Sequence, residues 1–204
     1  KIEEFDWDGN IVWQFNYASS SVMQHHDAKK LPNGNVLVIA WELKTEAESI
    51  VEGRNPSFVS SSGIWPDHII EVDSASGNII WEWHIWDHLI QDFDNTKENF
   101  GVVSEHPELI DINFVKQGNP TNTDWTHFNS FDYDSVFDQI LLSVHGFNEI
   151  WIIDHSTTTA EASGHSGGNS GRGGDILYRW GNPRAYGSWP GAAALARPST
   201  RPPR

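Results

Sequence analysis

The sequence contains no cysteine, which excludes disulfide bonds, zinc–thiolate sites and thiol nucleophiles. Positive charge is also scarce, because 13 Lys and Arg stand against 28 Asp and Glu and the formal net charge is −15. A chain this acidic is a poor match for nucleic acid or for an anionic membrane surface. No apolar run approaches the length of a membrane-spanning helix. We therefore expect no nucleic-acid partner and no membrane insertion.

The sequence is rich in aromatic residues and glycine, with 11 Trp, 10 Phe and 17 Gly. Aromatic and β-branched side chains favour strands. One pattern occurs three times, at residues 9–15, 77–83 and 174–180. In each copy a Gly-Asn or Gly-Asp turn precedes a segment in which apolar and polar residues alternate, which is typical of a hairpin and a half-buried strand. The sequence therefore predicts an all-β fold.

A second repeat carries histidines. Residues 24–27 read Gln-His-His-Asp and precede Leu-Pro-Asn-Gly-Asn and an apolar run, while residues 124–130 read Asp-Trp-Thr-His-Phe-Asn-Ser and precede the apolar run 139–144. Strands that end in an acidic residue follow in both copies. A histidine that recurs in a four-strand unit predicts a β-propeller, in which the inner strands converge on one axis. The alternative is an ordinary β-sandwich with accidental internal similarity.

We expect residues 1–187 to be a partial β-propeller domain of about two full blades plus one outer strand. Residues 188–204 are rich in Ala, Pro and Arg and are predicted to be a disordered tail or a reading-frame artefact. The polar segment 44–66 is predicted to be an insertion between the first and second strands of a blade. The glycine-rich segment 156–173 lacks the Gly-Lys-Ser/Thr ending of a phosphate loop and precedes a strand, so we expect a long hairpin loop.

Taken in order, these segments resemble the arylsulfotransferase family of bacterial aryl-sulfate sulfotransferases. The resemblance covers about residues 5–187 and includes the runs 147–158 and 178–183. It implies a six-bladed propeller that needs no cofactor and no nucleotide sulfate donor. It also implies transfer of a sulfuryl group from a phenolic sulfate ester to a phenol through a sulfated histidine. By the same resemblance, the location is periplasmic or secreted.

The family pattern can be carried over residue by residue. His26 and His127 stand at two supporting histidine positions of the catalytic site, and Asn129 stands at the family's asparagine. His25 remains an alternative to His26 as the active member of the pair. This sequence has His145 where the family has an arginine, so the forked guanidinium is replaced by an imidazole that is charged only when protonated.

The substrate's aryl ring requires a stacking partner, and Trp41 or Trp125 is predicted to supply it. The nucleophilic histidine is expected in a further Gln-His and Leu-Pro-Asn-Gly-Asn run after residues 178–183. That run is absent from this sequence. We therefore expect this chain to lack its nucleophile and to be inactive alone.

The remaining histidines and tryptophans receive structural interpretations. We predict no metal site, since the neighbours His25 and His26 would point to opposite faces of a strand. His155 is expected to hold a turn. Five strand tryptophans are expected to pack between blades, and four histidines are expected at the surface or in loops: Trp13, Trp81, Trp83, Trp151 and Trp180; His84, His88, His106 and His165.

Two other functions compete with the enzyme. A propeller with a histidine-lined axis also suits a non-catalytic module that binds a sulfated or phenolic ligand, because a fold alone does not decide function. A quinoprotein dehydrogenase is another Trp-rich propeller, but the acidic cluster expected for its calcium and quinone is not visible, so it ranks last.

Overall fold

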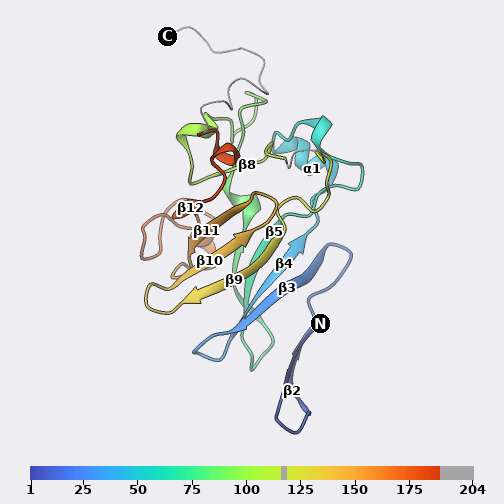
Figure 1. The fold of residues 1–204 in the computed structure, drawn as a ribbon, viewed down its shortest axis with the longest axis vertical. Coiled ribbons are helices and arrows are strands. Elements are labelled where there is room, and N and C mark those ends of the chain that lie inside the picture. The colour runs from blue at the N-terminus through green and yellow to red at the C-terminus, as the bar shows by residue number, and fades with distance from the viewer. Residues whose placement is uncertain (116–118, 189–204) are drawn as a thin grey trace.

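The computed structural model describes residues 1–115 and 119–188. It confirms the all-β prediction, because the larger elements are two four-stranded antiparallel sheets (Figure 1). The first sheet contains β3 (Val22–Lys30), β4 (Val36–Glu42), β5 (Asp67–Val72) and β6 (Ile79–His84). The second contains β9 (Phe128–Asp134), β10 (Gln139–Val144), β11 (Glu149–Asp154) and β12 (Tyr178–Trp180).

The smaller elements lie before, between and after these sheets. β1 (Ile2–Phe5) and β2 (Ile11–Phe15) form an antiparallel hairpin, and β7 (Leu89–Ile90) pairs in parallel with β8 (Ile110–Asp111). The α-helices are α1 (Glu46–Val51) and α2 (Thr159–Ala162), and short 3-10 helices occupy Pro56–Phe58, Ile85–His88, Val103–Glu105 and Pro183–Tyr186. Within the described ranges, no helix is long and apolar enough to cross a membrane.

Each four-stranded sheet is a simple meander, in which strands that are consecutive in sequence are neighbours in space. The alternating sequence patterns predicted most of these strands correctly. The predicted place of the 44–66 insertion is wrong, because this segment connects β4 to β5, the second and third strands of its sheet. Segment 156–173 does connect β11 to β12, as expected, but it also contains α2.

The first sheet is buried on both faces. Val36 and Val38 of β4 face the N-terminal hairpin, where they pack with Trp13. Leu37 and Ile39 of the same strand face the second sheet in the main core. The period-2 alternation of a strand thus supplies two apolar faces, and β4 reads as an almost continuous hydrophobic run because neighbours cover both sides. β5 is also buried at every position, although it includes Asp67, His68 and Glu71.

Tryptophans fill much of the space between the sheets. Trp81, Trp83 and Trp151 are buried in the main core, as predicted. Trp13 is half-buried against the first sheet. Trp180 departs from the prediction, because 66% of its surface is exposed on the outer strand β12.

The first strands of the two sheets, β3 and β9, lie beside one another (Figure 1). The backbone N–H of Phe131 donates to Asp27 across this junction at 3.2 Å, and Lys29 forms an ion pair with Asp132. The described residues contain no sheet that closes into a ring. The prediction for residues 188–204 concerns a segment that, apart from Ser188, lies outside the described residues.

Candidate functional site

Two histidines occupy corresponding places in the two sheets and share an unusual backbone. φ is 53° at His26 and 50° at His127, in the left-handed region. Such values in non-glycine residues cost roughly 1–3 kcal/mol and persist where the surroundings enforce them. His26 lies in β3 where the pairing with β4 shifts register between Gln24 and Ala28, and His127 directly precedes β9. The histidine repeat predicted from the sequence is therefore also a conformational repeat.

His26 and His127 belong to one group of four imidazoles and one indole. We call this group the histidine cluster; it consists of His25, His26, Trp41, His127 and His145. The ring centroids of His26 and His127 are 4.7 Å apart, and those of His127 and His145 are 5.1 Å apart. His25 stacks on Trp41 with a centroid separation of 3.7 Å and an interplanar angle of 12°. The histidine cluster therefore joins β3 and β4 of the first sheet to the start of β9 and the end of β10 in the second.

A buried carboxylate, Asp67, holds both halves of this cluster. One of its oxygens accepts from Nε2 of His25 at 2.7 Å. The other accepts from the hydroxyl of Thr126 and, at 3.1 Å, from the backbone N–H of Phe128. Asp67 lies on β5 and is completely buried, and these donors flank His127, so one side chain fixes the position of histidines from two sheets.

The hydrogen bonds around His25 determine which nitrogens carry protons when both rings are neutral. Because Nε2 of His25 donates to Asp67, its Nδ1 accepts from Nδ1 of His26 at 2.8 Å. The Nε2 of His26 is then a bare lone pair. The pKa of His26 is lowered by burial and by the neighbouring His25 and His127, which favours the neutral form of this ring. Burial raises the pKa of Asp67, while hydrogen bonds from His25, Thr126 and Phe128 oppose that rise.

His127 is oriented by a second carboxylate. Its Nδ1 is hydrogen-bonded to Asp124, three residues earlier, so Nε2 is the ring nitrogen left for a substrate. Within the described residues, the other oxygen of Asp124 and Nε1 of Trp41 are buried without hydrogen-bond partners. Buried polar atoms normally have partners, and both of these atoms belong to or touch the histidine cluster. Such atoms are typical of a site that completes its hydrogen bonds with a ligand.

A glycine allows His145 to approach His127. The backbone N–H of Gly146 donates to the carbonyl of Thr126 at 2.8 Å, and that of His145 donates to the carbonyl of His127 at 3.0 Å. A Cβ at position 146 would lie 2.3 Å from the carbonyl oxygen of Trp125. Glycine is therefore required where this hairpin crosses the chain, and the crossing places the imidazole of His145 inside the histidine cluster.

The two remaining predicted residues, Asn129 and Trp125, differ in their burial. Asn129 is exposed on β9. Trp125 is buried in the core, where its Nε1 donates to the carbonyl of Phe114 at 2.8 Å and its ring packs against Arg54 and Phe147. Its indole is 4% exposed and is already enclosed by these contacts. The geometry therefore favours Trp41 over Trp125 as the stacking partner of a substrate.

The other histidines divide between burial and exposure. His106 and His165 are exposed as predicted, whereas His88 is completely buried between Asp175 and the carbonyl of Ala162, so the surface prediction for it is wrong. His84 is half-buried between two glutamates. His155 holds the β9–β10 turn, as predicted, because its Nδ1 hydrogen-bonds to Asp138 at 2.7 Å.

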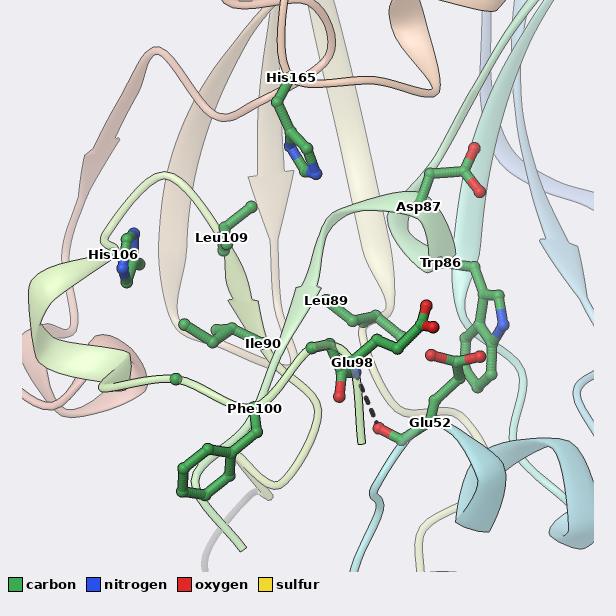
Figure 2. A pocket seen from close by; sticks show the side chains of 12 residues that line it. Glu52, Trp86, Asp87, Leu89, Ile90, Glu98, Phe100, His106, Leu109 and His165 are labelled. Atoms are coloured by element: carbon green, nitrogen blue, oxygen red, sulfur yellow. Dashed lines mark hydrogen bonds between the residues drawn. The ribbon is translucent and has the colours of Figure 1, made fainter. Parts of the chain in front are cut away.

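A cavity of about 390 Å³ lies away from this cluster (Figure 2). Glu52, Asp87 and Glu98 contribute carboxylates to its wall, beside Trp86 and Phe100. No member of the histidine cluster lines it. Its acidic lining disfavours an anionic ligand, so the histidine cluster, with its imidazole and indole donors, is the better candidate for binding a sulfate ester.

Asp67 and Asp124 are the site residues that the sequence analysis did not single out. Asp124 lies within the repeated segment 124–130, and its spacing of three residues from His127 was a usable signal. Asp67 follows Pro66 at the start of β5 and belongs to no repeated pattern. Its contact with Thr126 and Phe128 joins residues about sixty positions apart in the chain, which only the fold reveals.

The class of protein is therefore an all-β chain with two repeated four-stranded sheets and a histidine cluster at their junction. The family described as arylsulfotransferase (ASST) matches residues 1–161. The chain belongs to the arylsulfotransferase (ASST) family, as the sequence analysis expected. The match includes the whole histidine cluster and ends before the run 178–183. No curated protein matches the chain.

Proposed function

We propose that this chain carries part of the active site of an aryl-sulfate sulfotransferase. The substrates are a phenolic sulfate ester as donor and a phenol as acceptor. One observation carries the proposal. The rings of His26 and His127, from the two sheets, lie side by side, and the buried carboxylate of Asp67 binds the neighbour of each, His25 and Phe128. A site that is rigid, partly desolvated and lined by imidazoles suits the transfer of a sulfuryl group, which needs mainly positioning and charge stabilisation.

The proposed reaction has two halves. In the first, the bond between sulfur and the aryl oxygen breaks as a bond from sulfur to a histidine nitrogen forms, and the departing phenolate takes a proton. In the second, the acceptor phenol loses its proton and its oxygen displaces the histidine from sulfur. The resemblance assigns the sulfated histidine to a run that this sequence does not contain, so the residues here supply the supporting chemistry.

Each member of the cluster receives a role from its hydrogen bonds. His26 presents a bare Nε2 and accepts the proton of the acceptor phenol, while Asp67 and His25 behind it stabilise the positive charge that then develops. His127, oriented by Asp124, donates from Nε2 to a sulfuryl oxygen or to the leaving phenolate when its ring carries both protons. Positioned acid–base groups of this kind typically contribute about 10²–10⁴-fold in rate.

The remaining residues bind the substrate. Trp41 stacks on His25 with one ring face, and its Nε1 is buried without a partner, so we assign it an aromatic contact with the substrate and, once the site opens to the ligand, a donor for a sulfate oxygen. His145 and Asn129 complete the oxygen contacts from β9 and the end of β10. A single imidazole at position 145 holds one oxygen where the family's arginine offers a fork.

We also propose that the two sheets are blades of a β-propeller. The N-terminal hairpin, the first sheet and the second sheet stack face to face in sequence order, which is the arrangement of neighbouring blades. The outer face of the second sheet is apolar on the side of β11 and β12, with Leu141, Ile152 and Tyr178 in one cross-strand row that ends at Asp132 of β9. Leu141 and Tyr178 are exposed, which supports a further blade on that face. By family analogy, the proposed location is periplasmic or secreted.

The second candidate function is a non-catalytic module that binds a sulfated or phenolic ligand. The histidine cluster is compatible with this second function, because its residues can bind the ligand without the histidine that would be sulfated. Release of coloured 4-nitrophenolate from 4-nitrophenyl sulfate, with phenol as acceptor, separates the two functions. Turnover by this chain alone would mean that a nucleophile is present among its own histidines.

Binding tests the site itself. We expect the chain to bind 4-nitrophenyl sulfate in a calorimetric titration, and we expect His127→Ala to weaken the affinity at least tenfold. His106→Ala is the matched control, because His106 is an exposed histidine paired with Glu108 outside the cluster. No binding by the unmodified chain, or equal losses in both variants, would contradict the proposed site.

A further inference from the structure

A second group of polar residues lies on the opposite face of the first sheet. We propose that Glu42, His68 and His84 form a binding site for a zinc-type divalent cation. One ligand atom from each residue lies within 4.8 Å of the others. His68 of β5 pairs directly with His84 of β6, and Glu42 ends β4. Because strand neighbours alternate faces, Glu42 and His68 point away from Trp41 and Asp67, so this metal site is separate from the histidine cluster.

The strongest indication comes from His68. Its side chain is completely buried, and Nδ1 has no hydrogen-bond partner among the described residues. Its Nε2 lies 3.3 Å from the hydroxyl of Tyr17. With the Nε2 proton directed at that oxygen, Nδ1 is a bare lone pair in the interior. Leaving a buried acceptor unsatisfied is costly, whereas a metal ion satisfies it directly.

The other two ligands are oriented in the way that metal ligands usually are. His84 points Nδ1 at Glu42, 3.0 Å away, and its Nε2 is hydrogen-bonded to Glu82 at 3.0 Å. The second oxygen of Glu42 is held by Lys44 at 2.7 Å. A ligating histidine commonly donates its other N–H to a carboxylate, which fixes the ring. The ion would therefore enter between Nδ1 of His84 and the near oxygen of Glu42, in place of a proton.

Charge and geometry define the ion. With neutral imidazoles, Glu42, Glu82 and Lys44 leave one negative charge, which favours a cation. Two histidines and one carboxylate form a common zinc ligand set with one position left open. Zinc bonds of about 2.0–2.1 Å place neighbouring ligand atoms about 3.4 Å apart. The ligand atoms lie within 4.8 Å of one another, so His68 must move closer, while Nδ1 of His84 and Glu42, now 3.0 Å apart, separate slightly and the stacked rings, now 4° from parallel, tilt.

A second group, His88, His165 and Asp175, provides the comparison. Both Nδ1 atoms there face one Asp175 oxygen, at 3.1 and 2.7 Å, and Nε2 of His88 is hydrogen-bonded to the carbonyl of Ala162. His165 is 63% exposed. This group leaves no buried nitrogen unpartnered, so we expect zinc at the first group and use His165 as the control position.

The test is a calorimetric titration of the chelator-treated chain with zinc chloride, repeated by cobalt absorption spectroscopy in the visible range. We expect one ion per chain, a cobalt spectrum of tetrahedral nitrogen and oxygen ligands, and affinity at least tenfold weaker in His68→Gln and in Glu42→Gln. His165→Ala should bind like the unmodified chain. Circular dichroism checks that each variant is folded, and Glu42→Gln serves if His68→Gln is not.

Three results would overturn the proposal. The unmodified chain could bind no zinc, both Glu42→Gln and His68→Gln could bind as tightly as it does, or His165→Ala could remove the binding. Zinc should also raise the melting temperature of the unmodified chain, because an ion that binds only the folded state stabilises it, and this rise should disappear in Glu42→Gln. None of these readouts depends on an aryl sulfate, so the metal site and the proposed sulfotransferase site can fail independently.

Discussion

At the scale of single residues, the site depends on a buried carboxylate that never needs to touch substrate. Asp67 accepts hydrogen bonds from His25, Thr126 and Phe128. A buried carboxylate is stabilised only while its donors remain in place. The same contacts position the ring of His25 and the chain on both sides of His127, so fold stability and the geometry of the proposed site are coupled at one position.

Replacing Asp67 with Asn tests this coupling. The amide retains one acceptor oxygen but turns an NH₂ group either toward Nε2 of His25 or toward both the Thr126 hydroxyl and the N–H of Phe128, which leaves donors facing donors. Hydrogen bonds to charged groups contribute about 1.5–3 kcal/mol each, so we expect urea denaturation to give a free energy of unfolding lower by about 2 kcal/mol, together with weaker aryl-sulfate binding. Asp132→Asn, at an exposed ion pair with Lys29, should change neither; equal effects at both positions would refute the role of Asp67.

Trp41 permits a sharper separation of binding from stability. Its Nε1 has no partner within the described structure, so Trp41→Phe keeps an aromatic ring on His25 but removes a donor that stabilises nothing in the unliganded protein. We expect unchanged thermal stability and affinity for 4-nitrophenyl sulfate reduced about tenfold, as expected for one lost hydrogen bond of about 1.5 kcal/mol. Trp180→Phe, on the exposed outer strand, is the control. Unaltered binding by Trp41→Phe would remove Trp41 from the site.

At the scale of elements, polar contacts join the two sheets near the β9–β10 turn. This is the opposite end of the second sheet from residues 145–148, which connect β10 to β11. His155 follows β11 and pairs with Asp138 at 2.7 Å and with Glu71 of β5 at 3.0 Å. Asn33 and Asn35 hold the other oxygen of Glu71. The Leu-Pro-Asn-Gly-Asn run that marks the family is therefore structural here, because its asparagines anchor the carboxylate that binds the second sheet.

This junction predicts a pH-dependent stability. Burial lowers the pKa of His155, but Glu71 and Asp138 outweigh it, and the net shift is upward from 6.5. A raised histidine pKa adds stability that is complete below about pH 6.5 and is lost as the pH rises through the folded-state pKa. We expect the difference in unfolding free energy between the unmodified chain and His155→Gln to shrink over that interval. A difference that stays constant or grows toward alkaline pH would show that His155 is not the titrating group.

At the scale of the whole molecule, the sheets stack in sequence order and leave an apolar outer face on the second sheet. Leu141, Tyr178 and Trp180 are exposed there. Exposed apolar sheet faces promote association. We expect the chain to associate and to show poor solubility, and we expect Leu141→Thr combined with Trp180→Ser to shift it toward monomer in analytical ultracentrifugation. A monodisperse monomer with a sharp, cooperative melting transition would contradict this expectation.

The sequence predicted the parts of the structure that repeat. Strands β4, β5, β10 and β11 followed from alternation and apolar runs, and His26 and His127 followed from their place in the unit. The sequence could not indicate which face each side chain occupies, and so Trp125 was grouped with Trp41 although the core encloses it. It also could not reveal the contacts of Asp67, or the pairing of His68 with His84, because those contacts depend on strand register and on the packing of one sheet against the next.

The central claim is that His26 and His127 together form a binding site for an aryl sulfate. Histidine side-chain NMR during titration with 4-nitrophenyl sulfate tests it most directly, because each imidazole reports separately and variants assign the signals. We predict that the resonances of His26 and His127 shift together and saturate at one ligand per chain, while His106 is unaffected. Shifts confined to His106 and His165, beside the acidic cavity, or no shift in any histidine, would contradict the account.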